Sequence, residues 1–567
     1  MNVADYIVDF LIKKEVTDVF GIPGGVVLDF LYAIDRKKEI SAHLCCHEQA
    51  AAFAAVGYAQ VNNKLGVAYS TRGPGFTNMI TAIAEAYYDS IPVFFITGHS
   101  VDEQNKKMRI EYDQELEISS IVKNISKYNI NINSADEIPT ELEKAYKIAM
   151  TGRPGPVILN ISSKIWLQQI ENYKVNNNEM PQLFSSAFEP YACSIEDEQQ
   201  DYSYILQEII SELNIAKRPV ILIGDGVNQS GTKKYLKSFI EKTRIPVVSS
   251  RGASDILADS PSYYGYIGSH GIREANFIIS KADLIISLGN RLSYPVNSKS
   301  FSQISAKIIR IDIDEAEFER QIPNCINFKA HLKIFMPQLE KQNVKYRTYN
   351  SWSDICDNLK NQLMNQDNNI IVKKIKQILD NLNNNNVIVS DVGNNEFFLS
   401  KACTLSKVPN RVLYSKSFGT LGCALPKSIG AYYATKQNVI CFTGDQGFQF
   451  NIQDMQTIAV NKLPILCIII NNKSSGMILD REKMTNKPKY LHTTYNDGYS
   501  NPDFGGLAKG WKVNYYNKLQ DKYLLPAILE LSFDEIIHLE PFLEKGEPCQ
   551  NLSPKIDKNL YCDLNNL

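Results

Sequence analysis

Residues 439–472, VICFTGDQGFQFNIQDMQTIAVNKLPILCIIINN, contain two short apolar runs separated by a segment that is long enough for a helix. The first run ends at Asp445 and the second at Asn472. Both runs are apolar through the middle instead of alternating, which is typical of strands covered on both faces. The stretch therefore predicts a strand, a crossover helix and a second parallel strand, with an acidic and an amide side chain at the strand ends.

The same pattern extends outward along the whole chain. Apolar runs that end in Gly, Asp or Asn occur at 65–73, 92–98, 219–226, 282–289 and 387–393, with helical stretches between them. This alternation predicts an α/β fold with three doubly wound parallel-sheet domains. In such sheets, ligands bind beyond the carboxyl ends of the strands, where these Gly, Asp and Asn residues lie.

Two polar, asparagine-rich stretches, 168–200 and 340–369, are predicted to be linkers. They divide the chain into a first domain at 1–168, a central domain at 200–338 and a third domain at 370–545. The remaining residues, 546–567, have the composition of an arm that lies over the surface.

Composition and charge argue against several classes of partner. Of the 567 residues, 44% are hydrophobic and 22% are charged, and the net charge of -2 gives no electrostatic basis for binding nucleic acid or an anionic membrane surface. No signal peptide is visible, and no apolar run reaches the roughly 18 residues that a membrane span needs. The 11 cysteines are scattered without a CxxC pair, which indicates reduced, buried thiols in a cytoplasmic protein.

The ends of the two strands in 439–472 offer oxygen ligands for a metal ion. A carboxylate at Asp445 and an amide oxygen at Asn472 suit an octahedral Mg²⁺ that also binds phosphate oxygens and water. Gly444 and Gly447 let the backbone approach a diphosphate, and the following helix presents its N-terminal amides. The alternative is that Asp445 only caps that helix.

In the first domain, CHEQAAAFAAVGYAQ places Glu48 ahead of a helix of small residues. Gly57 and the alanines allow another backbone to pack closely against this helix. A carboxylate among small and apolar residues is costly unless it has a dedicated partner, which indicates a functional role for Glu48. The alternative is an ordinary glutamate that the helix dipole favours.

These motifs together carry a resemblance to a known family. FGIPGG, HEQAAAFAAVGYA, TRGPGFTN, AYYDSIPVFFITG and TGRPGPV resemble the pyrimidine-binding domain of the large-subunit acetolactate synthases. DVG, SFGTLGCALPKSIGA, GDQGFQFNIQ and IIINNKSSGMI resemble their diphosphate-binding domain, and the order is the family's order over nearly the whole chain. The resemblance implies thiamine diphosphate (ThDP) and Mg²⁺ as cofactors. It also implies a homodimer or homotetramer in which each active site lies between two subunits.

The resemblance assigns roles to individual residues. Glu48 matches the glutamate that hydrogen-bonds the cofactor's aminopyrimidine and favours its imino tautomer. In the family, the nitrogen of that tautomer removes the thiazolium proton. The thiazolium ring then accepts electrons from a decarboxylating 2-oxo acid. Gln114 matches a glutamine close to the reacting carbonyl. Asp445 and Asn472 match metal ligands, and Ser474 matches a third ligand position, served by its side chain or by its backbone carbonyl.

Further positions match segments that contact the cofactor. They are Gly24, Gly25, Asn78, Asn394, Asn395, Gly419, Leu421, Gly444, Gln446, Gly447, Phe448, Gly476 and Met477. Leu421 stands where the family has a bulky apolar residue under the bend of the cofactor, and core packing is its alternative role. Gln446 departs from the family, which has a small residue there. We interpret it as local variation because Asp445 and Asn472 stay in register.

The central domain contains four segments that resemble the FAD-binding segments of the biosynthetic acetolactate synthases. They are IGDGVN (223–228), YGYIGSHG (264–271), SLGNRLS (287–293) and IRIDID (309–314). The matching residues are Gly224, Gly226, Gly268, His270, Gly289, Arg291 and Asp312. The resemblance therefore implies bound FAD, which does no net redox chemistry in this family. Glycines after strands are also ordinary in α/β folds, and relatives without FAD keep many of them.

Three positions depart from the acceptor pocket of the biosynthetic synthases. Asp113 replaces a phenylalanine, Arg481 replaces a tryptophan, and Pro295 replaces an arginine that binds the acceptor's carboxylate. A pocket that loses an arginine fork and gains Asp and Arg is more polar and suits a hydroxylated or charged acceptor. A one-residue shift of register in these loops is the alternative.

The chain also resembles the synthase-like carboligases of surface-polysaccharide pathways, including the branched-sugar, yersiniose type. GDQGFQFNIQ and the tail GEPCQNLSP carry this likeness. It implies pyruvate as the two-carbon donor and a carbonyl acceptor such as a nucleotide-linked keto-sugar. Three alternatives stay open: an acetolactate synthase catalytic subunit, a simple 2-oxo acid decarboxylase and a catalytically inactive relative. The intact Glu48, Asp445 and Asn472 argue against the last.

Overall fold

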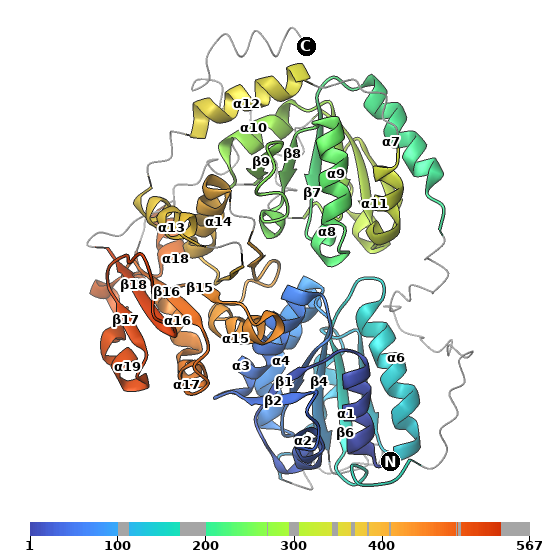
Figure 1. Ribbon diagram of the computed structural model, residues 1–567, viewed down its shortest axis with the longest axis vertical. Coiled ribbons are helices and arrows are strands. Elements are labelled where there is room, and N and C mark those ends of the chain that lie inside the picture. Colours follow the sequence, from blue (N-terminus) through green and yellow to red (C-terminus); the bar gives the residue numbers. More distant parts are fainter. Residues whose placement is uncertain are drawn as a thin grey trace.

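Three parallel sheets, each of six strands, form the framework of the protein (Figure 1). In the computed structural model, the described residues are 1–99, 113–170, 200–268, 270–293, 305–342, 350–364, 369–382, 385–407, 410–483, 485 and 489–533. The first sheet is blue, the central sheet green and the third sheet orange to red in Figure 1, and each lies in its own region. The predicted α/β class with three parallel-sheet domains is confirmed.

The first sheet has the strand order β2-β1-β3-β4-β6-β5. Its strands are β1 (Asp18–Gly21), β2 (Ser41–Leu44), β3 (Gly66–Tyr69), β4 (Val93–His99), β5 (Tyr128–Ile132) and β6 (Val157–Ser162). The accompanying helices are α1 (Val3–Lys13), α2 (Leu28–Asp35), α3 (Glu48–Asn62), α4 (Pro74–Asp89), α5 (Ser119–Val122) and α6 (Ile138–Met150). The four inner strands β1, β3, β4 and β6 are buried along their whole length.

The central sheet has the order β12-β11-β10-β7-β8-β9. Its strands are β7 (Pro219–Ile223), β8 (Val247–Ser249), β9 (Tyr263–Tyr266), β10 (Leu284–Leu288), β11 (Lys307–Asp312) and β12 (Cys325–Lys329). The helices are α7 (Ser203–Ile215), α8 (Gly226–Gln229), α9 (Lys233–Thr243), α10 (Arg273–Lys281), α11 (Leu332–Glu340) and α12 (Asn350–Met364). The strand order is that of dinucleotide-binding domains, with the change of direction between β7 and β10.

The third sheet has the order β14-β13-β15-β16-β18-β17. Its strands are β13 (Val387–Ser390), β14 (Val412–Leu413), β15 (Val439–Gly444), β16 (Ile465–Asn471), β17 (Asn514–Tyr516) and β18 (Ala527–Ser532). The helices are α13 (Ile370–Asp380), α14 (Asn394–Ser406), α15 (Ala424–Thr435), α16 (Asp445–Phe450), α17 (Met455–Val460), α18 (Gly476–Lys483) and α19 (Phe504–Trp511). Strands β15 and β16 pair in parallel, as the pattern of residues 439–472 predicts.

The first and third sheets share one topology, although no repeat is visible in the sequence. In each, the second strand lies on one side of the first and the third strand lies on the other side. The chain therefore changes direction between β1 and β3 and again between β13 and β15. Loops diverge at such a switch point and leave a crevice at the carboxyl ends of the strands, which is where open α/β sheets bind their ligands.

Helix α3 of the first domain packs directly against α15 of the third domain, and both lie between the two sheets in Figure 1. Alanines cover α3 on every side, so its residues from Ala50 to Gln60 are buried without an amphipathic pattern. A Cβ on Gly57 would overlap the backbone of Lys427, and a Cβ on Gly430 would overlap the backbone of Ala54. The small residues are therefore required for the close contact between the two helices, as the sequence predicts.

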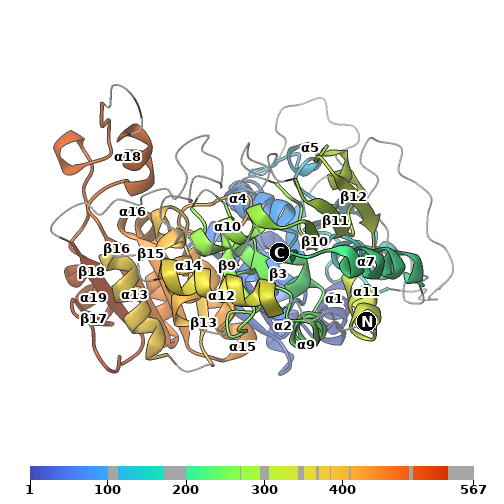
Figure 2. The same ribbon diagram turned by 90° about the horizontal axis from the view of Figure 1, so that it is seen from above.

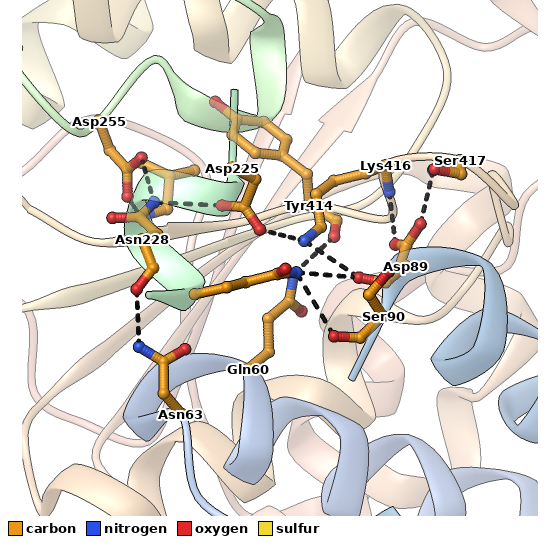
Figure 3. A network of polar contacts seen from close by, with 12 residues as sticks. Gln60, Asn63, Asp89, Ser90, Asp225, Asn228, Asp255, Tyr414, Lys416 and Ser417 are labelled. Atoms are coloured by element: carbon orange, nitrogen blue, oxygen red, sulfur yellow. Dashed lines mark hydrogen bonds and ion pairs between the residues drawn. The ribbon is translucent and has the colours of Figure 1, made fainter. Parts of the chain in front are cut away.

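A network of polar side chains joins all three domains near the C-terminal end of α3 (Figure 3). Asp225 of the central domain forms an ion pair with Lys416 of the third domain, and Asp255 forms one with Arg411 at 2.8 Å. From the first domain, Gln60 donates its side-chain amide to the carbonyl of Tyr414 at 2.9 Å. These contacts surround a cavity of about 80 Å³ at the junction. The domains are thus joined by paired, half-buried or buried charges and by the hydrogen bond from Gln60.

The predicted linker at 340–369 is partly wrong, because helix α12 lies inside it. Trp352, Ile355, Cys356 and Leu359 are buried against the core of the central domain. Their spacing is that of one face of a helix, and the surrounding asparagines obscure it in the sequence. Figure 2 shows α12 alongside α10 of the central domain. The predicted domain boundaries themselves stay predictions, and the predicted arm at 546–567 lies outside the described residues.

Two further expectations concern the thiols and the membrane. The cysteines at described positions are free, and all but Cys46 and Cys325 are buried. Within the described residues, no helix combines the length and the apolar character that crossing a membrane requires.

Candidate active site

The first half of the candidate site lies at the switch point between β1 and β3. Glu48 is the first residue of α3, and its Oε2 accepts a hydrogen bond from the side-chain amide of Asn78 at 2.9 Å. A Cβ on Gly75 would lie 3.3 Å from Oε1 of Glu48, so the glycine leaves that oxygen uncovered. A Cβ on Gly24 would overlap Thr71 in the loop after β3. The two loops thus meet around Glu48.

Gln114 joins the same half-site through its backbone. Gly73 has a φ of 60°, and a Cβ on it would overlap the carbonyl of Gln114. Gln114 itself has a φ of 59°. Gly25, on the loop after β1, has no atom within 4 Å of the place where a Cβ would stand. Glu48, Asn78 and Gln114 therefore lie on neighbouring segments together with the two predicted glycines, Gly24 and Gly25.

The second half of the candidate site lies at the switch point between β13 and β15. Asp445, Asn472 and Ser474 are buried, with 2%, 7% and 2% of their surface exposed. Burial raises the pKa of the Asp445 carboxyl group, and hydrogen bonds from Asn501 and from the backbone of Gln446 act in the opposite direction. The Asn501 amide donates to Oδ2 of Asp445 at 2.7 Å, and the Gln446 N–H donates to Oδ1 at 3.1 Å.

Several features of this half fit a diphosphate and a divalent cation. Among the described residues, no atom lies within 4 Å of the places where a Cβ on Gly393, Gly419 or Gly444 would stand, so the loops after β13, β14 and β15 leave open space. The buried Ser474 Oγ and Asn395 Oδ1 have no hydrogen-bond partner in the same part of the chain. Unpaired buried oxygens are costly, and a bound cation or its water ligands would satisfy them.

The remaining predicted cofactor contacts lie around the same crevice. A Cβ on Gly476 would lie 2.6 Å from Nδ2 of Asn472 and 3.2 Å from Nδ2 of Asn394, so this glycine lets α18 approach both amides. Phe448 is buried against Phe504, with ring centroids 5.5 Å apart, and its contact with the cofactor stays a prediction. Met477 on α18 is 38% exposed.

No cluster of three His, Cys, Asp or Glu side chains suited to a metal occurs among the described residues. The predicted Mg²⁺ site depends on one carboxylate with amide and hydroxyl oxygens, so this result does not bear on it.

Sequence reasoning missed three residues of this half-site. Asp391 accepts hydrogen bonds from Gly422 N–H at 2.9 and 3.1 Å, and from Thr443 Oγ1 at 3.0 Å. Asn501 bridges Asp445 and Asn471, and Asp480 accepts from Asn394 at 2.6 Å. Asp391 follows a predicted strand and could have been found by that position. Asn501 and Asp480 lie in a loop and on a short helix whose sequences carry no signal.

The two halves do not meet within the described residues of one chain. No hydrogen bond or ion pair there joins Glu48 with Asp445, Asn472 or Ser474. The start of α3 instead contacts the start of α17, where Cys46 N–H donates to Oδ1 of Asp454 at 3.0 Å. A site shared between two subunits therefore stays a prediction.

In the central domain, the predicted flavin residues lie near the carboxyl ends of four strands, with Gly224, Gly226 and Gly289 at the switch point between β7 and β10. The backbones of Gly224, Gly226 and Gly289 pack against one another, and Gly289 has a φ of 56°. Gly268 has a φ of 123°, and its N–H donates to Oδ1 of Asn276 at 3.0 Å. Close backbone packing or a positive φ explains why each of these positions is a glycine, without a bound ligand.

The charged residues beside them give a different indication. Burial lowers the pKa of Arg291, and the neighbouring Arg153 lowers it further, while Glu317 acts in the opposite direction. Arg310 and Arg320 both donate to the carbonyl of Arg291, at 2.9 and 3.0 Å. Glu317 forms ion pairs with Arg153, Arg291 and Arg320, so acidic side chains offset much of the positive charge here. The Arg310 Nε is buried and has no hydrogen-bond partner among the described residues, which fits contact with an anionic group.

The last two predicted flavin residues are Asp312, which is buried, and His270, which is half-buried. Asp312 is 6% exposed and accepts from the Asp314 N–H at 3.1 Å, and burial raises the pKa of its carboxyl group. The His270 ring stacks on Phe397 of α14 with centroids 4.3 Å apart. Burial lowers the pKa of His270 to about 4, so the ring is neutral at pH 7.

The predicted acceptor residues are only partly placed. Asp113 and Arg481 are both exposed, and no ion pair joins them within the described residues. Pro295 lies outside the described residues.

Comparison with known proteins decides the family. Three domain families of thiamine pyrophosphate enzymes match the chain: the N-terminal TPP binding domain at residues 1–121, the central domain at 206–339 and the C-terminal TPP binding domain at 391–535. The probable acetolactate synthase large subunit of Methanococcus aeolicus is 32% identical over 90% of this chain and 87% of its own length. The chain belongs to the thiamine pyrophosphate enzyme family.

Other relatives within the thiamine pyrophosphate enzymes extend over still more of the chain. The acetolactate synthase large subunit of Lactococcus lactis is 31% identical over 96% of this chain and 92% of its own length. The acetolactate synthase isozyme 2 large subunit of Escherichia coli is 29% identical over 98% of this chain and all of its own length. The predicted resemblance to acetolactate synthase large subunits is confirmed. The finer resemblance to polysaccharide-pathway carboligases stays a prediction.

Proposed function

We propose that the protein is a ThDP- and Mg²⁺-dependent carboligase that decarboxylates pyruvate and transfers the two-carbon unit to a carbonyl acceptor. The observation that carries the proposal is the pair of half-sites at equivalent switch points. One presents Glu48 held by Asn78. The other buries Asp445 with Asn472 and Ser474 around open space.

Glu48 is proposed to hold and exchange a proton with a ring nitrogen of the cofactor. Its Oε2 is engaged by Asn78, which fixes the carboxylate, while Gly75 leaves space beside Oε1. Gln114, whose backbone rests on Gly73, is proposed to contact the substrate carbonyl. ThDP supplies, when bound, a thiazolium ring that accepts the electrons released by decarboxylation.

Asp445, Asn472 and Ser474 are proposed to hold Mg²⁺ beside the diphosphate. Burial raises the pKa of the Asp445 carboxyl group, and a divalent ion at this position would favour its charged form. Asn394 and the open backbone at Gly393, Gly419 and Gly444 are proposed to take the diphosphate oxygens.

The acceptor is proposed to be a ketone without a carboxylate, such as a nucleotide-linked keto-sugar. Asp113 would repel a second 2-oxo acid, and Pro295 cannot supply the bidentate arginine contact that a carboxylate needs. Arg481 is exposed and is proposed to meet a charged group of the acceptor.

Acetolactate synthesis from pyruvate and a 2-oxo acid is the second candidate. The relatives named acetolactate synthase match the chain over nearly its whole length, which favours this reaction. Product analysis by mass spectrometry separates the two candidates. The enzyme is incubated with pyruvate alone and with pyruvate plus candidate keto-sugars.

A flavin is proposed at the carboxyl ends of β7 and β10. The dinucleotide-type strand order and the buried Arg310 Nε, which has no hydrogen-bond partner among the described residues, support it. A purified protein that is yellow would agree with this proposal. A colourless protein that is fully active without added FAD would contradict it.

A homodimer is proposed as the smallest active unit. Exposed apolar side chains lie close to both half-sites in the sequence: Leu28 follows the glycines of the first half, and Met477 and Ile478 follow Gly476 in the second. Burial of such residues between subunits would stabilise an assembly.

Glu48→Gln tests the function most simply. Because the substitution removes the proton-exchanging group, turnover of pyruvate should fall about 10²–10⁴-fold while ThDP binding is largely kept. Glu143→Gln, on the surface at α6, is the matched control and should keep normal activity. Near-normal turnover by Glu48→Gln would show that the site has been assigned wrongly.

A further inference from the structure

The segment from Ser415 to Thr420 connects β14 to the region of Leu421, the residue proposed to lie under the bend of the cofactor. Ser417, Phe418 and Gly419 are exposed, and Gly419 has a φ of 71°. The Phe418 ring stacks on Tyr88 of α4 with centroids 5.5 Å apart, and hydrogen bonds to the backbone fix the rest of the segment. We call residues 415–420 the bend loop.

Asp89, the last residue of α4, holds the backbone of the bend loop. Its Oδ2 accepts from the Lys416 N–H at 2.7 Å and its Oδ1 from the Ser417 N–H at 2.7 Å. Figure 3 shows Asp89 beside these two residues. Asp89 is 3% exposed, so both charge-assisted hydrogen bonds are shielded from water.

Glu85, one turn earlier on α4, holds the same loop through Ser415. Its Oε2 accepts from Ser415 Oγ at 3.0 Å. That hydroxyl oxygen in turn accepts from the N–H groups of Gly419 and Thr420, each at 3.0 Å. Two carboxylates of the first domain therefore set the path of the third-domain backbone up to the residue before Leu421.

The opposite end of α4 serves the other half-site. Helix α4 begins at Pro74, and Asn78 in its first turns donates to Glu48. One helix of 16 residues thus fixes Glu48 at one end and the bend loop at the other. A displacement of α4 would disturb both groups of residues together.

We propose that Asp89 and Glu85 are positioning residues that place Gly419 and Leu421 against the cofactor by fixing the bend loop. They act through the loop and touch neither substrate nor cofactor. This inference rests on the proposed function and on the role of Leu421 under the bend of the cofactor, which the resemblance implies. It goes beyond that role because it states that carboxylates of the first domain fix a loop of the third domain in the same chain.

Asp283 provides a matched control because it makes the same pair of contacts elsewhere. Its carboxylate accepts from the N–H groups of Lys217 and Arg218 at 2.8 and 2.9 Å, in the central domain. Asp89→Asn and Asp283→Asn each remove one charge from a carboxylate bound to two successive backbone amides. The first should affect the bend loop and the second only its own loop.

The experiment measures amide hydrogen exchange in the cofactor-free chain, and then ThDP affinity, KM and kcat for carbon dioxide release from pyruvate. In Asp89→Asn, exchange at Lys416 and Ser417 should rise about 10- to 100-fold, and kcat should fall by a similar factor, with ThDP affinity and KM changed much less. Asp283→Asn should raise exchange at Lys217 and Arg218 and leave kcat normal.

Combination with Leu421→Ala tests the route of the effect. If Asp89 acts through the bend loop, the double variant should be no slower than the slower single variant. Three results would overturn the inference and leave the proposed function in place. They are a kcat in the double variant that falls by the product of the two single losses, an unchanged kcat in Asp89→Asn, and an equal loss of kcat in Asp283→Asn. A natural chain that binds ThDP but does not release carbon dioxide from pyruvate would overturn the proposed function. In that case, hydrogen exchange and ThDP affinity still decide whether Asp89 fixes the loop.

Discussion

The ion pair between Lys427 on α15 and Glu85 on α4 gives a quantitative prediction about the contact between the first and third domains. Both side chains are fully buried, and the Glu85 carboxylate also accepts from Ser415. Lys427→Met removes the cation and leaves the Glu85 charge buried. The loss of one partner from a buried pair costs about 3–5 kcal/mol of unfolding free energy, because the remaining charge has neither water nor a counter-ion.

The assay is thermal unfolding of the cofactor-free protein. One kcal/mol lowers the melting temperature of a domain of 150–250 residues by about 2–4 °C, so Lys427→Met should lower it by about 6–20 °C. The double variant Glu85→Gln/Lys427→Met contains no buried charge at this place and should recover most of the loss. A single variant that melts within about 2 °C of the natural chain, or a double variant as unstable as the single, would refute the reasoning.

Three further predictions concern the pH dependence, the cofactor and the helix contact. Burial raises the pKa of Glu396 from 4.5 to about 7 although Arg251 lies 3.2 Å away. The folded chain therefore holds this proton more tightly than the unfolded chain, and the free energy of unfolding should fall as the pH rises from about 4.5 to about 7. Glu396→Gln should remove that part of the slope in melting curves, and an unchanged slope would contradict it. ThDP with Mg²⁺ at about 100 times its dissociation constant should add roughly 2.7 kcal/mol of stability, and Asp445→Ala should abolish the shift in melting temperature. Gly430→Ala should destabilise the protein by about 1–3 kcal/mol or more, because its methyl group would overlap the backbone of Ala54, and normal melting would argue against the close helix contact.

The sequence is informative where one residue type meets a local requirement. Asp445 and Asn472 end apolar strands, and Gly57 lies in an alanine helix, so the parallel sheets, the polar crevice and the close contact of α3 could all be predicted. Each of these inferences needs only the period of the pattern and the position of a residue within it.

The sequence is uninformative where tertiary structure brings distant side chains together. Asn501 bonds Asp445 from a loop, and Asp89 holds a backbone segment of another domain. Nothing in the local pattern of either residue indicates its partner. The sequence does not indicate helix α12 because its four buried apolar residues at described positions are spread among asparagines and other polar residues, whose composition resembles a linker.

The steady-state rate of acetolactate formation from pyruvate alone distinguishes the two proposed reactions. If Asp113 and Pro295 occupy, as the resemblance implies, the positions at which the biosynthetic synthases bind a second 2-oxo acid, this rate should be slow or absent. Pyruvate consumption should become faster when a ketone without a carboxylate is added. Rapid conversion of pyruvate alone, with acetolactate as the sole product, would contradict the proposed acceptor and identify the chain as an ordinary acetolactate synthase.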